Sequence, residues 1–132
     1  MLDAQGLVKL AAGDPAVRGR VYAAQERGSR IVTAASTLAE VVRSKATDHK
    51  IHWVLRDVDV VPITKDTGRK AGELLGATGL SGHRNTVDAL LATVALAQLR
   101  PTLLVTSDPD DMAKLTEEPQ RKKTERVAII PV

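Results

Sequence analysis

Short β-like runs alternate with helical patterns along the whole chain, and this alternation is the feature that most limits its possible folds. Each run is separated from the next by a segment long enough for a helix, so neighbouring strands are expected to be parallel. At 132 residues the chain suits a single domain over 1–132 that buries roughly 68% of its unfolded surface. The expected strands are Met1–Asp3, Arg30–Ala34, Val58–Ile63, Thr102–Thr106 and Val127–Val132.

The helical patterns have recognisable starts and stops. Gly13-Asp14-Pro15 separates a first helix from a second that begins at Pro15, a residue suited to a first helical turn. A later helix is apolar nearly all round, so we expect it to be buried. A loop is expected over 76–83. The expected helices are Ala4–Ala12, Pro15–Arg27, one beginning at Ser36 or Thr37, a short one within Asp48–Arg56, Thr64–Leu75, Asn85–Leu99 and Pro109–Leu115.

Four carboxylates lie beside expected strand ends or in the first turn of a helix: Asp3, Glu40, Asp88 and Asp108. In a parallel sheet such positions can meet at one edge. Clustered carboxylates resist full ionisation unless they share a cation. The chain has no Cys and no His pair at helical spacing, which argues against zinc. An all-oxygen site favours Mg²⁺ or Mn²⁺, and the pattern therefore predicts a divalent metal site.

Each acid also has an ordinary structural explanation. Thr37 and Glu40 match a capping box, and Asn85 is a candidate cap for a helix with Asp88 in its first turn. Asp108 begins a turn and is followed by two further acids, so the assignment among the three stays open. If all four acids were caps, the chain would be a plain α/β interaction protein.

Composition narrows the function classes. No stretch approaches the ~20 apolar residues that a membrane span requires, and no signal peptide is recognisable. The absence of Cys fits a reducing, cytoplasmic compartment. The net charge of +3 permits a polyanionic partner. With Tyr22, Trp53 and no Phe, base stacking is not expected, so nucleic-acid binding would depend on cations and metal.

The acids lie in four short pieces whose order and spacing are specific as a set. The pieces are Leu2-Asp3-Ala4, Leu38-Ala39-Glu40-Val41, Leu80-Ser81-Gly82-His83 with Thr86-Val87-Asp88-Ala89-Leu90, and Val105-Thr106-Ser107-Asp108-Pro109. Over nearly its whole length the chain resembles the PIN-domain ribonucleases, in particular the VapC-type toxins of bacterial toxin–antitoxin pairs. The resemblance implies a three-layer α/β fold, with a central parallel sheet of about five strands flanked by helices and an acidic cleft.

The resemblance also implies a function. The chain would be a toxin of a type II toxin–antitoxin system and a Mg²⁺- or Mn²⁺-dependent endoribonuclease. Asp3, Glu40, Asp88 and Asp108 would be its metal-site and catalytic residues, with Thr106 or Ser107 supporting Asp108. We expect RNA contacts from Arg43, Lys45, Arg84 and Ser107.

For Arg43 the alternative is an ion pair with Glu40, one helical step away. Implied partners are the RNA substrate, a cognate VapB-like antitoxin lying across the cleft, and a second copy in a homodimer. We expect the antitoxin to cover apolar surface around Leu7, Leu10 and Val17.

Two positions depart from the family pattern. Only Met1-Leu2 precede Asp3, where several apolar residues are usual, and Gln5 stands near a position that often holds a small Ser, Thr or Gly. The Gln5 amide is expected either to coordinate the metal or to crowd it. These departures support one alternative function, a catalytically silent PIN-like module that binds RNA or protein.

Overall fold

The computed structural model describes residues 1–132, and its parallel strands lie in two pairs on either side of the N-terminal segment. One pair is β1 with β2, and the other is β3 with β4. Leu2 lies between the pairs and forms a parallel bridge with Val105 of β3. The expected sheet of about five strands is therefore four strands and a central segment only a few residues long. The strands are β1 Val32–Ala34, β2 Asp59–Val61, β3 Leu103–Thr106 and β4 Ala128–Pro131.

Hydrogen bonds hold this central segment on both sides. The Leu2 amide donates to the Val32 carbonyl at 2.9 Å, and the buried Thr33 hydroxyl donates to the Leu2 carbonyl at 2.8 Å. On the other side, Val105 donates to the Met1 carbonyl at 3.0 Å and accepts from the Asp3 amide at 3.1 Å. Buried backbone groups need such partners. Three residues therefore suffice to join the two strand pairs.

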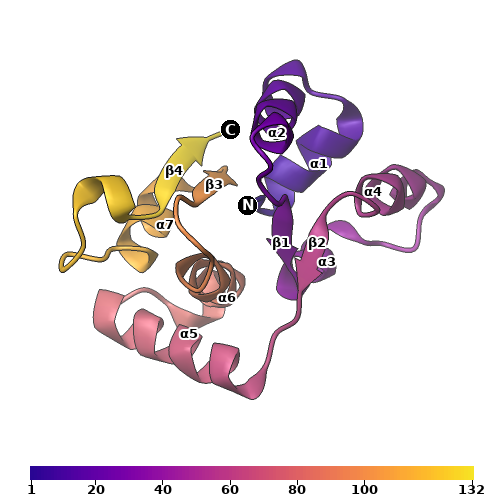
Figure 1. Cartoon of the computed structure of the whole chain (residues 1–132). Coiled ribbons are helices and arrows are strands. Elements are labelled where there is room, and N and C mark those ends of the chain that lie inside the picture. Colours follow the sequence, from indigo (N-terminus) through magenta and orange to yellow (C-terminus); the bar gives the residue numbers. More distant parts are fainter.

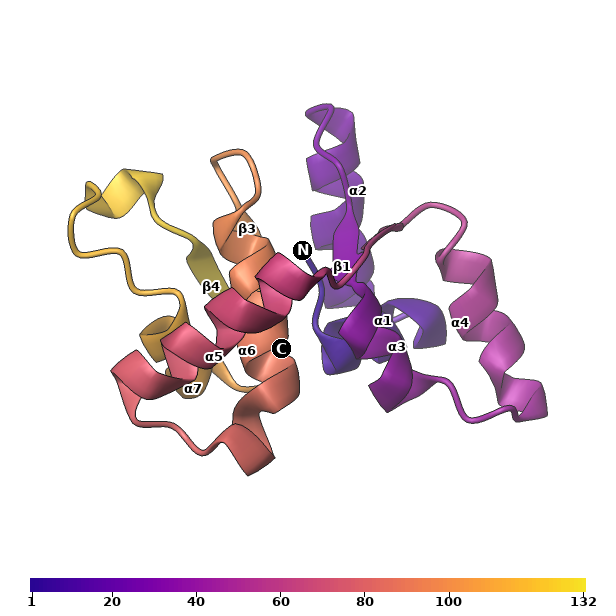
Figure 2. The ribbon, with the colours of Figure 1, turned by 90° about the horizontal axis from the view of Figure 1, so that it is seen from below.

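Helices cover both faces of the sheet, as Figures 1 and 2 show. One face carries α5, α6 and α7, and the other carries α1 to α4. Side chains alternate between the faces along each strand: Leu104 packs in the cluster beneath α5 to α7, and Val105 packs in the cluster beneath α1 and α4. The helices are α1 Ala4–Ala12, α2 Pro15–Glu26, α3 Ala35–Val41, α4 His49–Val54, α5 Lys65–Thr78, α6 Gly82–Leu96 and α7 Pro109–Leu115, with 3₁₀ turns at Ala46–Asp48 and Lys123–Glu125.

The predicted α/β fold and most of its elements are confirmed. Helices α1 and α7 have the predicted bounds, and α2 begins at Pro15 with Asp14 as its cap. The apolar helix α6 is buried along most of its length, including Leu91 and Val94. None of the helices has both the length and the hydropathy needed to cross a membrane.

Two local predictions are wrong. The expected loop over 76–83 is mostly helix, because α5 continues to Thr78 and ends at Gly79, whose φ of 68° suits a glycine. The remaining connection is short, and α6 starts at Gly82. The apolar surface expected around Leu7 and Val17 is not exposed, because both side chains are fully buried within this chain.

Candidate active site

Asp3 is held from two elements at the edge where the strands end. As the cap of α1, its Oδ1 accepts a hydrogen bond from the Gly6 amide at 2.6 Å. Its Oδ2 accepts from the Ser107 amide at 2.7 Å and from the Ser107 hydroxyl at 3.4 Å. Only 7% of the residue is exposed. Gly6 permits this arrangement, because a Cβ there would lie 3.3 Å from Asp3 Oδ1.

Asp88 comes from α6 and is half-buried among other acids. Burial and the charge of Asp108 raise the pKa of its carboxyl above the ordinary value, and the charges of Asp3 and Asp111 add to the effect. The side-chain amide of Asn85 opposes this rise in the pKa of Asp88. The carboxylate therefore stands in the field of at least three others, a destabilising arrangement without a counter-charge.

Glu40 faces the same group of acids from α3. Partial burial, followed by the charges of Asp88 and Asp3, raises the pKa of its carboxyl, and Arg43 acts in the opposite direction. Arg43 forms no ion pair with Glu40, because its guanidinium donates to the carbonyls of Ala39 and Val42. The expected alternative of an Arg43–Glu40 pair is therefore wrong at the level of direct contact.

The predicted capping box at Thr37 and Glu40 is also wrong. Helix α3 begins at Ala35, directly after β1, and Ala34 is its cap without any side-chain hydrogen bond. Thr37 therefore lies inside the first turn, fully buried, and its hydroxyl has no partner. Glu40 remains exposed. Because capping does not account for Glu40, its place beside the other acids needs a different explanation.

Asp108 follows β3 and caps α7, accepting from the Asp111 amide at 3.3 Å. Its own amide donates to the Thr106 hydroxyl at 3.0 Å. Thr106 thus supports Asp108, whereas Ser107 supports Asp3. Of the two acids that follow, Asp111 contributes to the field at Asp88, and Asp110 is exposed and makes no hydrogen bond.

The four acids thus approach one another at a single edge of the sheet, from four separate elements. As the side chains stand, no three acids or histidines lie close enough together to hold a metal ion. The donor set nevertheless suits Mg²⁺ or Mn²⁺, because every group is a carboxylate oxygen and the acids oppose one another's ionisation. Asp3 is fixed, while Glu40 and Asp108 are exposed and have room to turn their carboxylates toward it.

The cations expected to contact RNA are all on the surface. Arg43, Lys45 and Arg84 are exposed and form no salt bridge. Arg84 lies in the first turn of α6, four residues before Asp88. Gln5 is exposed on α1 and makes no hydrogen bond to any acid. Both expectations for the Gln5 amide, coordination of the metal and crowding of the site, stay predictions.

One contact in this region is not predicted by the sequence. Asn85 does not cap a helix: its amide donates to Asp111 Oδ2 at 3.0 Å. The available signal was the spacing of Asn85 and Asp88, which lie three residues apart and so share one helix face. Nothing local in the sequence indicated that Asp111, on another helix, would meet them.

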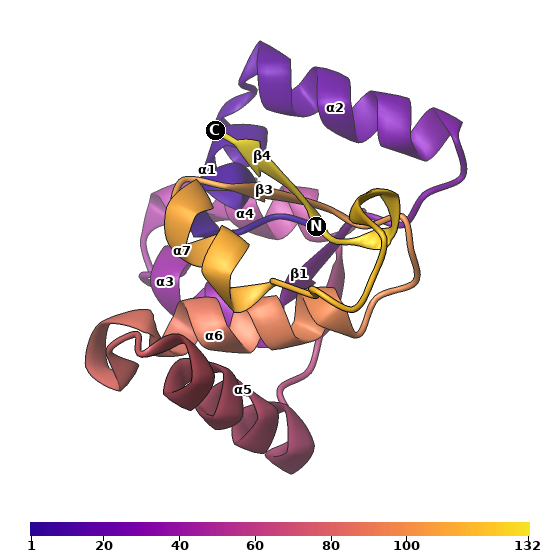
Figure 3. The same ribbon diagram turned by 90° about the vertical axis from the view of Figure 1, so that its left-hand side faces the viewer.

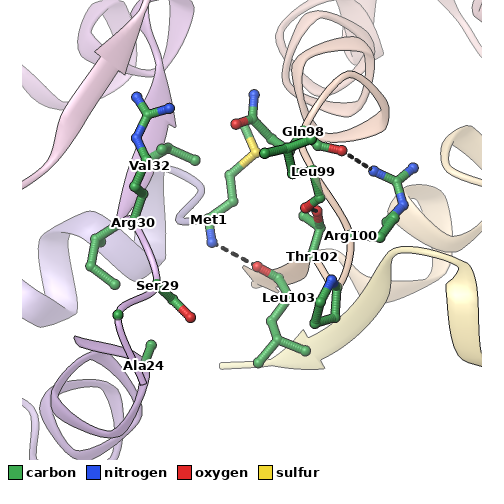
Figure 4. A pocket seen from close by; sticks show the side chains of 13 residues that line it. Met1, Ala24, Ser29, Arg30, Val32, Gln98, Leu99, Arg100, Thr102 and Leu103 are labelled. Atoms are coloured by element: carbon green, nitrogen blue, oxygen red, sulfur yellow. Dashed lines mark hydrogen bonds between the residues drawn. The ribbon is translucent and has the colours of Figure 1, made fainter. Parts of the chain in front are cut away.

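A hollow of about 350 Å³ lies elsewhere, at the edge where the strands begin (Figure 4). Met1, Arg30, Leu99, Arg100 and Leu103 are among its lining residues. Arg30 pairs with Asp59, and Arg100 pairs with Glu118. None of the four acids lines this hollow, so it is separate from the acidic edge.

Fold and site together define an α/β protein with four acids at the edge where its parallel strands end. The PIN domain family model matches residues 1–118, and the chain belongs to that family, whose members are generally nucleases. Among solved structures, it is similar to the crystal structure of VapBC2 from Rickettsia felis bound to a DNA fragment from their promoter. That match has a TM-score of 0.70 and 17% sequence identity, and it covers 100% of this chain and 97% of the other. No curated protein matches the chain significantly.

Proposed function

We propose that residues 1–132 form a single-domain, metal-dependent endoribonuclease that acts as the toxin of a VapC-type toxin–antitoxin pair. The observation that carries the proposal is the meeting of Asp3, Glu40, Asp88 and Asp108 at one edge. Asp88 feels the charges of Asp3 and Asp108, and Glu40 feels those of Asp3 and Asp88. Stability alone gives no reason to gather these charges, whereas a bound Mg²⁺ or Mn²⁺ does.

The four acids would hold the ion. A divalent cation there supplies positive charge that polarises a phosphate oxygen and lowers the pKa of an attacking water. Asp3, fixed by Gly6 and Ser107, sets the position of the site. Glu40, Asp88 and Asp108 complete the donor set.

In this proposal Asp108 orients the water that attacks phosphorus and accepts its proton. The bond from phosphorus to the 3′ oxygen breaks, which leaves a 5′ phosphate and a 3′ hydroxyl that takes its proton from solvent. Arg43, Lys45 and Arg84 would contact flanking phosphates, as exposed cations without ion pairs can. The Ser107 hydroxyl lies beside Asp3 and would contact the phosphate that the water attacks.

A VapB-like antitoxin and a second copy of the chain complete the proposed set of partners. Support for the antitoxin comes from the similar structure, which is of a VapBC pair on promoter DNA. The surface that it would cover differs from the sequence-based expectation, since Leu7 and Val17 are already buried. Leu10 is only partly buried and remains part of the surface of α1.

One observation favours the alternative of a silent binding module: no three of the acids stand within reach of one ion. A cleavage assay separates the two functions. Purified protein is incubated with a pool of structured RNAs, with and without Mg²⁺ or Mn²⁺, beside the variants Asp88→Asn and Asp110→Asn. Asp110 is the matched control, since it is a nearby exposed acid without a hydrogen bond.

We expect metal-dependent cuts by the wild type and by Asp110→Asn, and none by Asp88→Asn. Cleavage that survives both Asp88→Asn and EDTA would contradict the proposed site. Wild-type protein that neither cuts RNA nor binds metal in calorimetry would establish the silent module instead.

A further inference from the structure

The start of α6 is broken at Asn85. The residue has φ −107° and ψ 16°, outside the helical range, within the helix Gly82–Leu96. The Ser81 carbonyl accepts from the amides of both Arg84 and Asn85, at 3.2 and 2.8 Å. A kink of this kind changes where the following side chains point. The next turn of the helix carries Asp88.

The Asn85 side chain is buried, with 9% of the residue exposed, and it points toward acids. Its Nδ2 donates to Asp111 Oδ2 at 3.0 Å, which links α6 to α7 across 26 residues of sequence. Asp88 lies three residues further along the same face of α6. Figure 3 shows α6 and α7 side by side, and the two helices are in contact.

Neither capping nor core packing explains this contact. A capping side chain accepts from a backbone amide, whereas Asn85 donates to the Asp111 carboxylate. A buried residue chosen for packing would be apolar, because a buried amide is costly unless it is hydrogen-bonded. The bridge also holds the like charges of Asp88 and Asp111 near each other, although Lys114 pairs with Asp111 at 2.9 Å. The contact therefore serves to place a carboxylate.

We propose that Asn85 is a positioning residue: by binding Asp111 it ties the first turns of α6 to α7, and so fixes the direction in which the Asp88 carboxylate faces Asp3 and Asp108. This inference rests on the proposed metal site and extends it to two residues that do not themselves hold the ion. Asp111 holds Asn85 from α7, and Asp88 lies three residues beyond Asn85 on the same helix. Partners of this kind behind a ligand typically change metal affinity by about 10- to 100-fold when removed.

The test is calorimetric titration of the intact chain with Mn²⁺, which does not depend on any RNA substrate. The variants are Asn85→Ala, Asp111→Ala, the double variant and Asp111→Asn, which keeps an acceptor oxygen for the amide. Thr93→Ala is the matched control for lost stability, because the buried Thr93 hydroxyl donates to the Ala89 carbonyl two turns further along α6. The melting temperature of each variant is measured alongside.

We expect Asn85→Ala and Asp111→Ala each to weaken Mn²⁺ binding by about 10-fold or more. The double variant should be no weaker than the worse single one, because both remove the same bridge. Asp111→Asn should stay close to wild type, and Thr93→Ala should keep its affinity despite a lower melting temperature. Should Asn85→Ala not fold, the Asp111 pair carries the test, since that side chain is 24% exposed.

Three outcomes would overturn the inference, and they differ in whether they also reject the proposed metal site. Wild-type affinity in Asn85→Ala, with binding lost in Asp88→Asn, rejects the positioning role and leaves the metal site intact. Equal losses in Asp111→Asn and Asp111→Ala would make Asp111 a direct ligand and not an anchor. Wild-type protein that binds no Mn²⁺ would reject the proposed function together with the inference.

Discussion

Replacing Gly6 by alanine should disturb the site through a single methyl group. Gly6 lies in the first turn of α1, where its amide donates to Asp3 Oδ1. A Cβ at this position would stand 3.3 Å from that oxygen and 3.4 Å from the Val105 carbonyl oxygen. Neither atom can retreat easily: the Asp3 carboxylate is held by three donated hydrogen bonds, and the Val105 carbonyl accepts from the Asp3 amide.

Two opposing effects set the size of the change. An alanine in place of a glycine inside a helix ordinarily stabilises by about 1 kcal/mol. Forcing an extra group into a filled site costs about 1–3 kcal/mol. Gly72 in α5 provides the matched control, because it is exposed and a Cβ there would meet nothing within 4 Å. The free energy of unfolding of Gly6→Ala should therefore lie below that of Gly72→Ala by about 1–3 kcal/mol.

Urea unfolding of both variants, followed by Mn²⁺ titration, measures the two consequences. Gly72→Ala should be more stable than wild type and bind Mn²⁺ as wild type does. Gly6→Ala should lose the helix benefit and bind the ion more weakly, since Asp3 is displaced. If Gly6→Ala gained as much stability as Gly72→Ala and kept its affinity, the account of a tightly held Asp3 would be wrong.

Three further changes test other parts of the structure. The pKa of Asp88 is raised in the folded state, so the folded protein keeps a proton that the unfolded chain has already lost. The free energy of unfolding therefore falls as the pH rises from the ordinary aspartate pKa to the raised one, and it stays lower above that pH. Asp88→Asn should therefore stabilise the metal-free protein at pH 7 more than at pH 4 in thermal melts, and an equal effect at both pH values would contradict this. Thr37→Val should stabilise by about 1 kcal/mol in urea unfolding, because it removes a buried hydroxyl without a partner; a loss of stability would show that the hydroxyl is satisfied in solution. Glu118→Ala should destabilise by about 3 kcal/mol, because it leaves the largely buried Arg100 without its carboxylate at 2.8 Å, and a change below 1 kcal/mol would place that pair among weak surface contacts.

Where local chemistry decides, the sequence predicted the structure well. Helices α1 and α7 have the predicted bounds because each follows an aspartate that caps it, Asp3 and Asp108. The predicted start of α3 at Ser36 or Thr37 is wrong, because these residues resemble caps whereas the helix begins directly after β1. The predicted loop over 76–83 is too long, because Gly76 lies within α5 and only Gly79 takes a positive φ.

The same distinction holds for the site. The approach of Asp3, Glu40 and Asp108 to one another was predictable, because each follows a parallel strand and the ends of such strands share an edge. Asp88 reaches the same edge from α6, which follows another helix. The bridge from Asn85 to Asp111 was not predictable, because it depends on how α6 packs against α7. The exact directions of the carboxylates depend on such tertiary contacts, which no short motif encodes.

The place of Asp3 also determines when the site can exist during synthesis. Asp3 is made well before Ser107, which holds one of its oxygens and lies 104 residues later. The central segment likewise finds its partner in β3 only when Val105 is available. Contacts between such distant parts of a chain form late in folding. A chain on the ribosome that still lacks Ser107 therefore has no fixed Asp3, so any activity of the acidic edge waits until β3 and Ser107 have emerged.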